Sequence, residues 1–233
     1  MADLETGCNL TPMALLQLLM LGSPALPVGA YSYSEGIETL IEQGQIHSIE
    51  TLQHWLEQEL QWGSLVVEGA ILVRAYEAVQ QRDYAKLKYW NQWWSAARET
   101  AELRQQSWQM GRSLSRLLPA LDSSMLDWLE PCGSPCNWAI AFGGAAAHWQ
   151  IDLQSVLLAY VHSWASNLVS AGVKLVPLGQ TAGQQLLFHL SPQITVAAMQ
   201  AIALEDADLS SCSWGLALAS SQHETLMVRL FQS

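Results

Sequence analysis

Apolar residues recur at helical spacing along most of the chain. Between Ser48 and about Val79 the apolar positions follow the i, i+3, i+4, i+7 pattern of an amphipathic helix, and a second such stripe follows Arg82–Leu118. Pro119 is expected to stop this second helix, because proline lacks the backbone N–H. The chain has no Asn-Gly or Asp-Gly hairpin turn and no clean alternating run. The pattern therefore predicts an all-α fold.

Capping and turn residues divide the rest of the chain into helices. Thr11 and Pro12 form an N-cap and first-turn pair that opens an apolar run, and Gly22 ends it. The other predicted helices span about 33–43, 137–149, 153–173, 179–190, 191–207 and 213–230, with a loop at 131–136. No low-complexity linker or repeat divides the chain. We expect a single all-α domain over residues 1–233 with about nine or ten helices, a flexible N-terminus (1–10) and a C-terminal tail (about 220–233).

Charge is scarce and unevenly distributed. The 233 residues include 10 Lys and Arg against 21 Asp and Glu, so the formal net charge is −11 and charged residues make up 13%. Such an acidic chain is not expected to bind nucleic acid, which requires clustered cations. Residues 82–116 hold most of the basic residues, either as a docking stripe for an acidic partner or as a solvated face.

Residues 131–204 contain only two charged side chains, Asp152 and Lys174. The uncharged run Leu153–Val173 is long enough to cross a membrane, but its many polar side chains argue against a lipid-facing helix. We therefore expect no membrane span. Interface cores are depleted of charge, so this stretch favours burial against another chain.

Motifs for nucleotide, metal or nucleophile chemistry are missing from the sequence. There is no phosphate-binding loop, no G-x-G-x-x-G, no H-E-x-x-H and no G-x-S-x-G. Cys132 and Cys136 are either half of a metal site or reduced loop thiols. No signal-peptide pattern precedes the first helix. These observations predict a reduced, cytoplasmic protein without a cofactor.

Two segments have unusual local composition. In residues 23–38, two prolines and Gly29 lead into the polar cluster Tyr31–Glu35, which is either a rigid turn or a docking surface. In residues 162–187, small side chains recur three to five positions apart, so that another helix can approach closely. Lys174 is an isolated cation there, which either reaches the surface or pairs with a distant acid or carbonyl.

Four segments of the chain carry a resemblance to a known family. They are LLQLLMLGSPALPVGAYSYSEGIE near the start, RETAELRQQSWQMGRSL (Arg98–Leu114), SWASNLVSAGVKLVPLGQTAGQQLL (Ser163–Leu187) and SSQHETLMVRLFQS (Ser220–Ser233). Together, and in this order, they resemble the urease accessory protein F (UreF) family over nearly the whole chain.

The resemblance implies an all-α accessory protein without enzymatic activity, metal site or cofactor. It implies a homodimer that binds UreD (also called UreH) and the GTPase UreG, and that takes part in nickel insertion into apo-urease. The matching positions implied to bind partners are Tyr31, Tyr33, Glu35, Lys174, His223, Glu224 and Arg229. In the family the tail becomes ordered when partners bind, and its arginine lies near the loop tyrosine. An alternative from the residues alone is an all-α hydrolase or lyase using Glu35, His223 and Glu224.

Overall fold

The chain folds into helices throughout the part that the computed structural model describes, residues 10–210, 213–224, 226 and 229–232. The α-helices are α1 (Pro12–Leu21), α2 (Ile37–Glu42), α3 (Ile49–Trp62), α4 (Ser64–Gln80), α5 (Tyr84–Ala97), α6 (Ala101–Leu121), α7 (Leu126–Cys132), α8 (Trp138–His148), α9 (Leu153–Leu175), α10 (Gln180–His189), α11 (Ser191–Ala203) and α12 (Trp214–His223). Three 3₁₀ turns lie at Ala30–Ser32, Ser123–Met125 and Asp206–Asp208. The described ranges contain no strand, so the all-α prediction is confirmed. The predicted flexible N-terminus lies almost wholly outside the described residues.

The described residues contain more helices than the predicted nine or ten because both long apolar stripes are interrupted and because α7 was not predicted. Gly63, in an extended conformation, ends α3 and begins α4, and its N–H donates to the Glu59 carbonyl at 2.9 Å. Residues 98–100 separate α5 from α6, where the Thr100 hydroxyl accepts the Leu103 N–H at 3.1 Å. The apolar periodicity continues across each break, because it depends on which residues are buried and not on whether the helix is unbroken.

Several predicted helix ends are wrong for identifiable reasons. Pro119 lies inside the last turn of α6, where it removes only one hydrogen bond, and the Asp122 N–H then closes the helix on the Leu118 carbonyl at 2.9 Å. Helix α7 runs through Pro131 into the predicted loop at 131–136. Helix α11 ends at Ala203 instead of about 207, and Arg74 holds the chain there through the Leu204 carbonyl at 2.8 Å.

The helices predicted near the two ends of the chain also have different boundaries in the structure. The predicted helix at 33–43 is shorter and begins at Ile37, after Gly36, which has a positive φ of 81°. The last predicted helix, 213–230, ends at His223, and the described residues beyond it are not helical. The other predicted helices agree with the structure to within a few residues.

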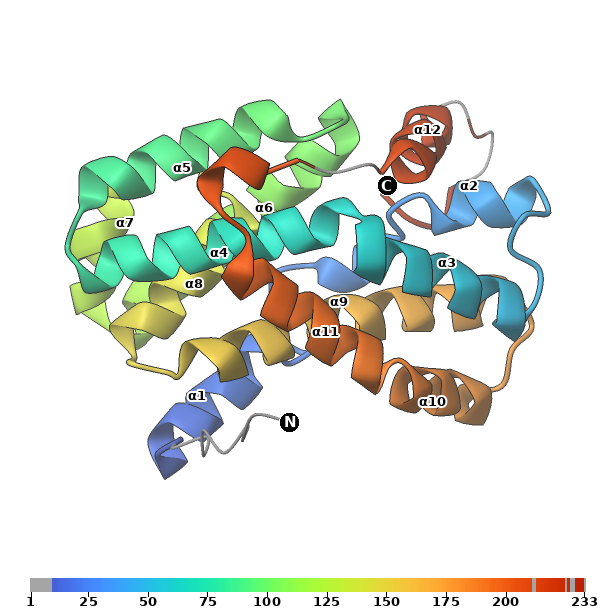
Figure 1. Cartoon of the computed structure of the whole chain (residues 1–233), viewed down its shortest axis with the longest axis horizontal. Coiled ribbons are helices and arrows are strands. Elements are labelled where there is room, and N and C mark those ends of the chain that lie inside the picture. The colour runs from blue at the N-terminus through green and yellow to red at the C-terminus, as the bar shows by residue number, and fades with distance from the viewer. Residues whose placement is uncertain (1–9, 211–212, 225, 227–228, 233) are drawn as a thin grey trace.

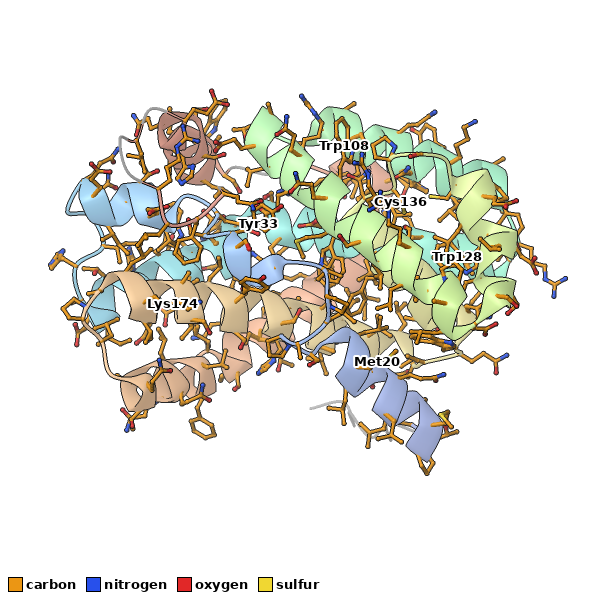
Figure 2. The ribbon with its side chains drawn as sticks, turned by 180° about the vertical axis from the view of Figure 1, so that it is seen from behind. Met20, Tyr33, Trp108, Trp128, Cys136 and Lys174 are labelled. Carbon is orange, nitrogen blue, oxygen red and sulfur yellow. The ribbon has the colours of Figure 1, made fainter. Side chains whose placement is uncertain are left out.

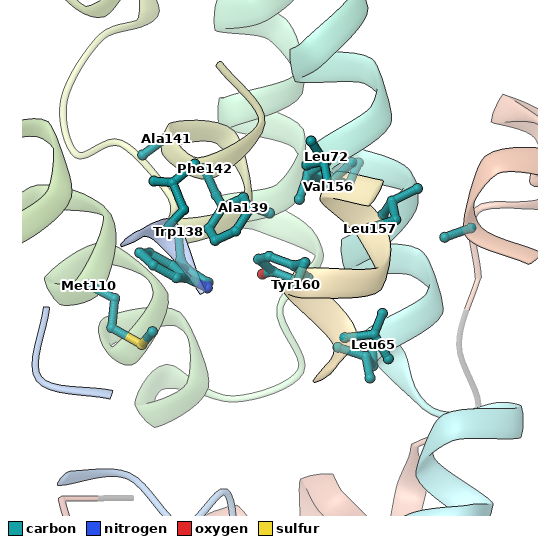
Figure 3. Close-up of a cluster of buried hydrophobic side chains, with 14 of the residues drawn as sticks. Leu65, Leu72, Met110, Trp138, Ala139, Ala141, Phe142, Val156, Leu157 and Tyr160 are labelled. Carbon is teal, nitrogen blue, oxygen red and sulfur yellow. The ribbon is translucent and has the colours of Figure 1, made fainter. Parts of the chain in front are cut away.

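Helix α4 forms the centre of the molecule, with fourteen of its 17 residues buried, and other helices pack around it (Figure 1). Helix α8 approaches it most closely, because a Cβ at Gly143 would lie only 2.6 Å from the Leu72 carbonyl oxygen. Beside this contact, Trp138, Phe142 and Tyr160 pack edge to face or stacked with ring centroids 5.1 to 6.3 Å apart (Figure 3). The core therefore joins α4, α8 and α9.

Helix α9 is long and apolar enough to cross a membrane, and α10 with α11 also passes this test as a pair bent by 47°. Within the fold, 56% of the apolar window of α9 is buried, as in a core helix of a globular protein. Its buried side chains, among them Tyr160, Leu168 and Val169, face protein.

Candidate functional site

The C-terminal segment (residues 229–232) is bound to helix α2 by one buried carboxylate. Helix α2 packs closely on α12, since a Cβ at Gly36 would lie 2.8 Å from the Ala219 Cβ. This places Glu38, which is only 7% exposed, beneath the chain terminus. The backbone N–H groups of Leu230 and Phe231 donate to the two Glu38 carboxylate oxygens at 2.7 and 3.2 Å. We call this arrangement the Glu38 anchor.

His223 joins the Glu38 anchor to helix α6. Its imidazole is fully buried, with Nε2 3.1 Å from Glu38 Oε2 and Nδ1 3.5 Å from Glu102 Oε1. Both ring nitrogens thus face carboxylate oxygens, one on α2 and one on α6. Arg229 extends the cluster, with Nη1 3.9 Å from the same Glu102 oxygen. Helices α2, α6 and α12 therefore meet the C-terminal segment in one network of charges.

Arg229 and Glu224 lie at the exposed edge of this network. The Arg229 side chain is 40% exposed and also donates to the Glu224 backbone carbonyl. The contact of the tail with the 30–32 turn is made by Gln232, whose N–H donates to the Ser32 carbonyl at 2.8 Å. The tail arginine therefore pairs with Glu102 of α6, while Gln232 reaches the turn that holds Tyr31.

A cavity of about 360 Å³ opens beside this contact. Tyr31, which is 64% exposed, and the exposed Lys174 of α9 both line it. The Lys174 Nζ lies 5.9 Å from the centroid of the Phe231 ring, a cation–π contact with the C-terminal segment. Figure 2 shows Lys174 and Tyr33 on the same side of the molecule. The tail therefore borders the mouth of the cavity.

Tyr33 and Glu35, both predicted to bind partners, face the protein instead of solvent. The Tyr33 hydroxyl donates to Gln109, and burial raises the pKa of this tyrosine. Glu35 adopts a positive φ of 49°, and its carboxylate accepts hydrogen bonds from Gln106 Nε2 at 2.7 Å and Trp164 Nε1 at 2.8 Å. Glu35 thus bridges α6 and α9 in the cavity wall.

Deeper in the cavity lies a buried ion pair that the sequence did not reveal. Arg98 Nη1 is 3.6 Å from Glu68 Oε2, and the guanidinium covers the Trp94 ring at 5.1 Å. Burial raises the pKa of the Glu68 carboxyl, and the nearby Arg98 charge only partly opposes this. Arg98 sits at the break between α5 and α6, so a continuous apolar stripe gave no sign that its side chain turns inward.

The three residues of the alternative hydrolase or lyase hypothesis each have their own set of neighbours. Glu35 is held by Gln106 and Trp164, His223 lies between Glu38 and Glu102, and Glu224 is exposed. In the part of the chain that the structure describes, the hydrogen bonds of these three side chains do not link a nucleophile, a base and an orienting group. Among the described residues, no cluster of three or more His, Cys, Asp or Glu could hold a metal ion.

Cys132 and Cys136 are free, buried thiols with their sulfur atoms 3.7 Å apart. The loop that carries them is held by Asn91, whose side-chain amide donates to the Pro135 carbonyl at 2.9 Å. Among the described residues, no third His, Cys, Asp or Glu completes a metal site with this pair.

Comparison with known proteins identifies the family to which the sequence is similar. The UreF family model matches residues 46–191. The chain is 59% identical over 225 residues to the "Urease accessory protein UreF" of a Nostoc species. The aligned region covers 97% of this chain and 98% of that relative. Proteins of the same name from a Synechocystis species and from Alkalilimnicola ehrlichii are 53% and 41% identical, over 96% and 98% of this chain and 100% and 99% of theirs. From the family match and these near full-length identities, the chain belongs to the UreF family of urease accessory proteins.

Proposed function

We propose that this chain is a non-enzymatic scaffold for urease maturation. As a homodimer in the cytoplasm it binds UreD (UreH) and the GTPase UreG, and the assembly couples GTP hydrolysis to nickel insertion into apo-urease. The observation that carries the proposal is the surface made by the C-terminal segment, Tyr31 and Lys174 beside the cavity mouth.

This surface has the composition of a protein interface. Tyr31 and Leu230 are 64% and 73% exposed, although both are large and apolar or aromatic. Arg229 and Lys174 place two cations among them. Aromatic residues and arginine are enriched at binding hot spots, where they anchor a partner. The contacts at Glu38 and Ser32 hold the backbone, so the tail presents its side chains in a fixed arrangement.

The sequence also fits an assembly in which another protein, the GTPase, binds and hydrolyses the nucleotide. It has no phosphate-binding loop, so nucleotide chemistry in the assembly falls to UreG. Four buried or half-buried residues support the surface without facing a partner. Their hydrogen bonds position Tyr31 and the C-terminal segment; these residues are Tyr33, Glu35, Glu38 and His223.

Co-purification from cells that express the chain with UreD, UreG and urease tests the proposal. Arg229→Ala and Tyr31→Ala are each expected to reduce recovery of the partners about tenfold, the loss typical of one moderate hot-spot residue. Phe188→Ala, an equally exposed aromatic on α10, is the matched control and should have no effect. Far-UV dichroism should show unchanged helix content in all three variants.

The nickel content of urease provides the functional measurement. Cells that lack this chain should contain nickel-poor urease, and the wild-type gene should restore the metal. Fully metallated urease in such cells would rule out the proposed role.

A further inference from the structure

Two free thiols lie in van der Waals contact at the connection between helices α7 and α8. Cys132 is the last residue of α7, and Cys136 lies two residues before the start of α8. Their Sγ atoms are 3.7 Å apart, with the Cys132 thiol donating to the Cys136 sulfur. A disulfide bond is about 2 Å long, so the two sulfur atoms need to approach by only about 1.7 Å to reach bonding distance.

The backbone of this connection already holds the two cysteines together. Gly133 has φ 88° and ψ 174°, a conformation essentially restricted to glycine, and this residue turns the chain back after α7. The side chain of Asn91, on α5, fixes the turn from outside. It donates to the Pro135 carbonyl at 2.9 Å and accepts the Asn137 N–H at 2.9 Å. Because the fold holds the loop in place, bonding of the two sulfurs costs little further chain freedom.

The two thiols differ in their access to solvent. Cys132 is fully buried, whereas Cys136 is 6% exposed and follows the exposed Ser134 and the partly exposed Pro135. The hydrogen bond to Cys136, and then burial, raise the pKa of Cys132 well above its usual range. Since the thiolate is the form that attacks a disulfide, Cys132 is not the first thiol to react. Local opening of residues 133–135 gives a small reagent access to Cys136.

We propose that Cys132 and Cys136 form a thiol–disulfide exchange site that takes a low-molecular-weight disulfide such as oxidised glutathione. The Cys136 thiolate attacks one sulfur of the small disulfide, which forms a mixed disulfide and releases one glutathione thiolate. The Cys132 thiolate then attacks the Cys136 sulfur and releases the second glutathione. Two protein thiols are thereby oxidised to one disulfide, one small disulfide is reduced to two thiols, and the two protein protons pass to the released thiolates.

The second step is favoured by the first. In the mixed disulfide Cys136 has no thiolate charge, so the hydrogen bond and the charge through which it acts on Cys132 both disappear. The Cys132 thiolate then forms more readily, next to the sulfur that it attacks.

The exchange makes the connection between α7 and α8 sensitive to redox conditions. A reducing compartment keeps the pair as two thiols, and a rise in small disulfides converts it. The disulfide would link α7 to the residues directly before Trp138, which begins α8 and lines the cavity of about 360 Å³. It would also restrict the unfolded chain, so the oxidised form is expected to be the more stable one. The inference is independent of the proposed function, because it concerns no partner protein and no metal.

Mass spectrometry of the full chain tests the inference. Cys8 and Cys212, which lie outside the described residues, are first replaced by serine so that only the pair remains. The folded chain is incubated with oxidised glutathione, and free thiols are then blocked with N-ethylmaleimide. The product should be lighter by two hydrogen atoms and carry neither maleimide nor glutathione. Cys132→Ser in the same background is the matched control, and its remaining Cys136 should carry one maleimide or one glutathione.

The wild-type chain gives the same test without any substitution. After the same treatment and proteolysis, the single peptide that holds Cys132 and Cys136 should be lighter by two hydrogen atoms. Two maleimides on this peptide would overturn the inference, and so would a disulfide that forms only when urea has unfolded the chain.

Thermal unfolding measures the effect of the bond on the fold. The oxidised chain should unfold at a midpoint about 4 °C or more above that of the reduced chain, whereas the Cys132→Ser control should show no shift after the same treatment. An oxidised chain that unfolds at a lower temperature than the reduced chain would show that the bond distorts the connection, and this result would also overturn the inference.

Discussion

Replacing Glu38 by Gln should release the C-terminal segment while the rest of the fold stays intact. The carboxylate accepts the N–H groups of Leu230 at 2.7 Å and Phe231 at 3.2 Å, and it faces His223 Nε2 at 3.1 Å. Glutamine keeps the size of the side chain but offers one acceptor oxygen instead of two. It also places an NH₂ group against groups that themselves donate hydrogen bonds.

The magnitude follows from the two backbone hydrogen bonds. A hydrogen bond to a charged group contributes about 1.5–3 kcal/mol, and one to a neutral group about 0.5–1.5 kcal/mol. Losing one charged bond and converting the other to a neutral bond therefore costs about 3 kcal/mol. Each 1.4 kcal/mol is a factor of ten, so the segment should open about 100 times more often in the variant.

Amide hydrogen exchange of the C-terminal peptide measures this opening. The amides of Leu230 and Phe231 should exchange about 100-fold faster in Glu38→Gln, while those of the buried helix α4 keep their protection. Glu42→Gln, at an exposed position of the same helix, is the control and should exchange like the wild type. Unchanged exchange at Leu230 and Phe231 in Glu38→Gln would refute the assignment of Glu38 as the anchor.

Three further substitutions test the packing and the buried polar groups by chemical denaturation. Gly111→Ala places a Cβ 2.1 Å from the Cys136 carbonyl oxygen and should lower the free energy of unfolding by about 3 kcal/mol or more, whereas Gly179→Ala, with open space around it, should be neutral. Asn91→Ala leaves the buried Asn137 N–H, now 2.9 Å from Asn91 Oδ1, without an acceptor and should cost about 2–3 kcal/mol; an unaltered unfolding midpoint would contradict this. Burial, assisted by the Glu35 and Glu99 carboxylates, raises the pKa of Glu59 from 4.5 to about 7. The protonated Glu59 thus stabilises the fold fully below about pH 4.5 and loses this effect as the pH rises through about 7, so Glu59→Gln should unfold with a flatter pH profile between these values.

Helix starts were the most predictable part of the fold. Thr11 accepts the Ala14 N–H at 3.1 Å and Pro12 follows it, as the sequence pair predicts. Such caps act within three or four residues, so the local sequence contains the whole interaction. Helix ends and breaks were less predictable. Gly63 and the break at 98–100 lie within continuous apolar stripes, and only the packing of the flanking helices requires the chain to turn there.

The resemblance named exposed residues of the candidate site and the buried Tyr33 and His223, but not the acidic residues that hold the tail. The resemblance pointed to Tyr31, Lys174 and Arg229, and all three lie at or beside the C-terminal segment. Glu38 and Glu102 were not singled out, although they hold the tail and His223. Each is an ordinary acidic residue on a helix, and its partner lies more than a hundred residues away along the chain.

The sequence by itself determined the all-α class, most of the helix starts and the family, because these depend on local spacing, capping chemistry and recurring motifs. Only the tertiary structure decided which charges are buried, since Arg98 and Glu38 look like surface residues in the sequence. In the fold, Arg98 lies against Glu68 and Trp94, and Glu38 lies against His223 and the C-terminal segment. It also decided that the apolar helix α1 keeps one face uncovered. Apolar composition states how much surface seeks burial, whereas the arrangement of the other helices determines how much this chain can bury alone.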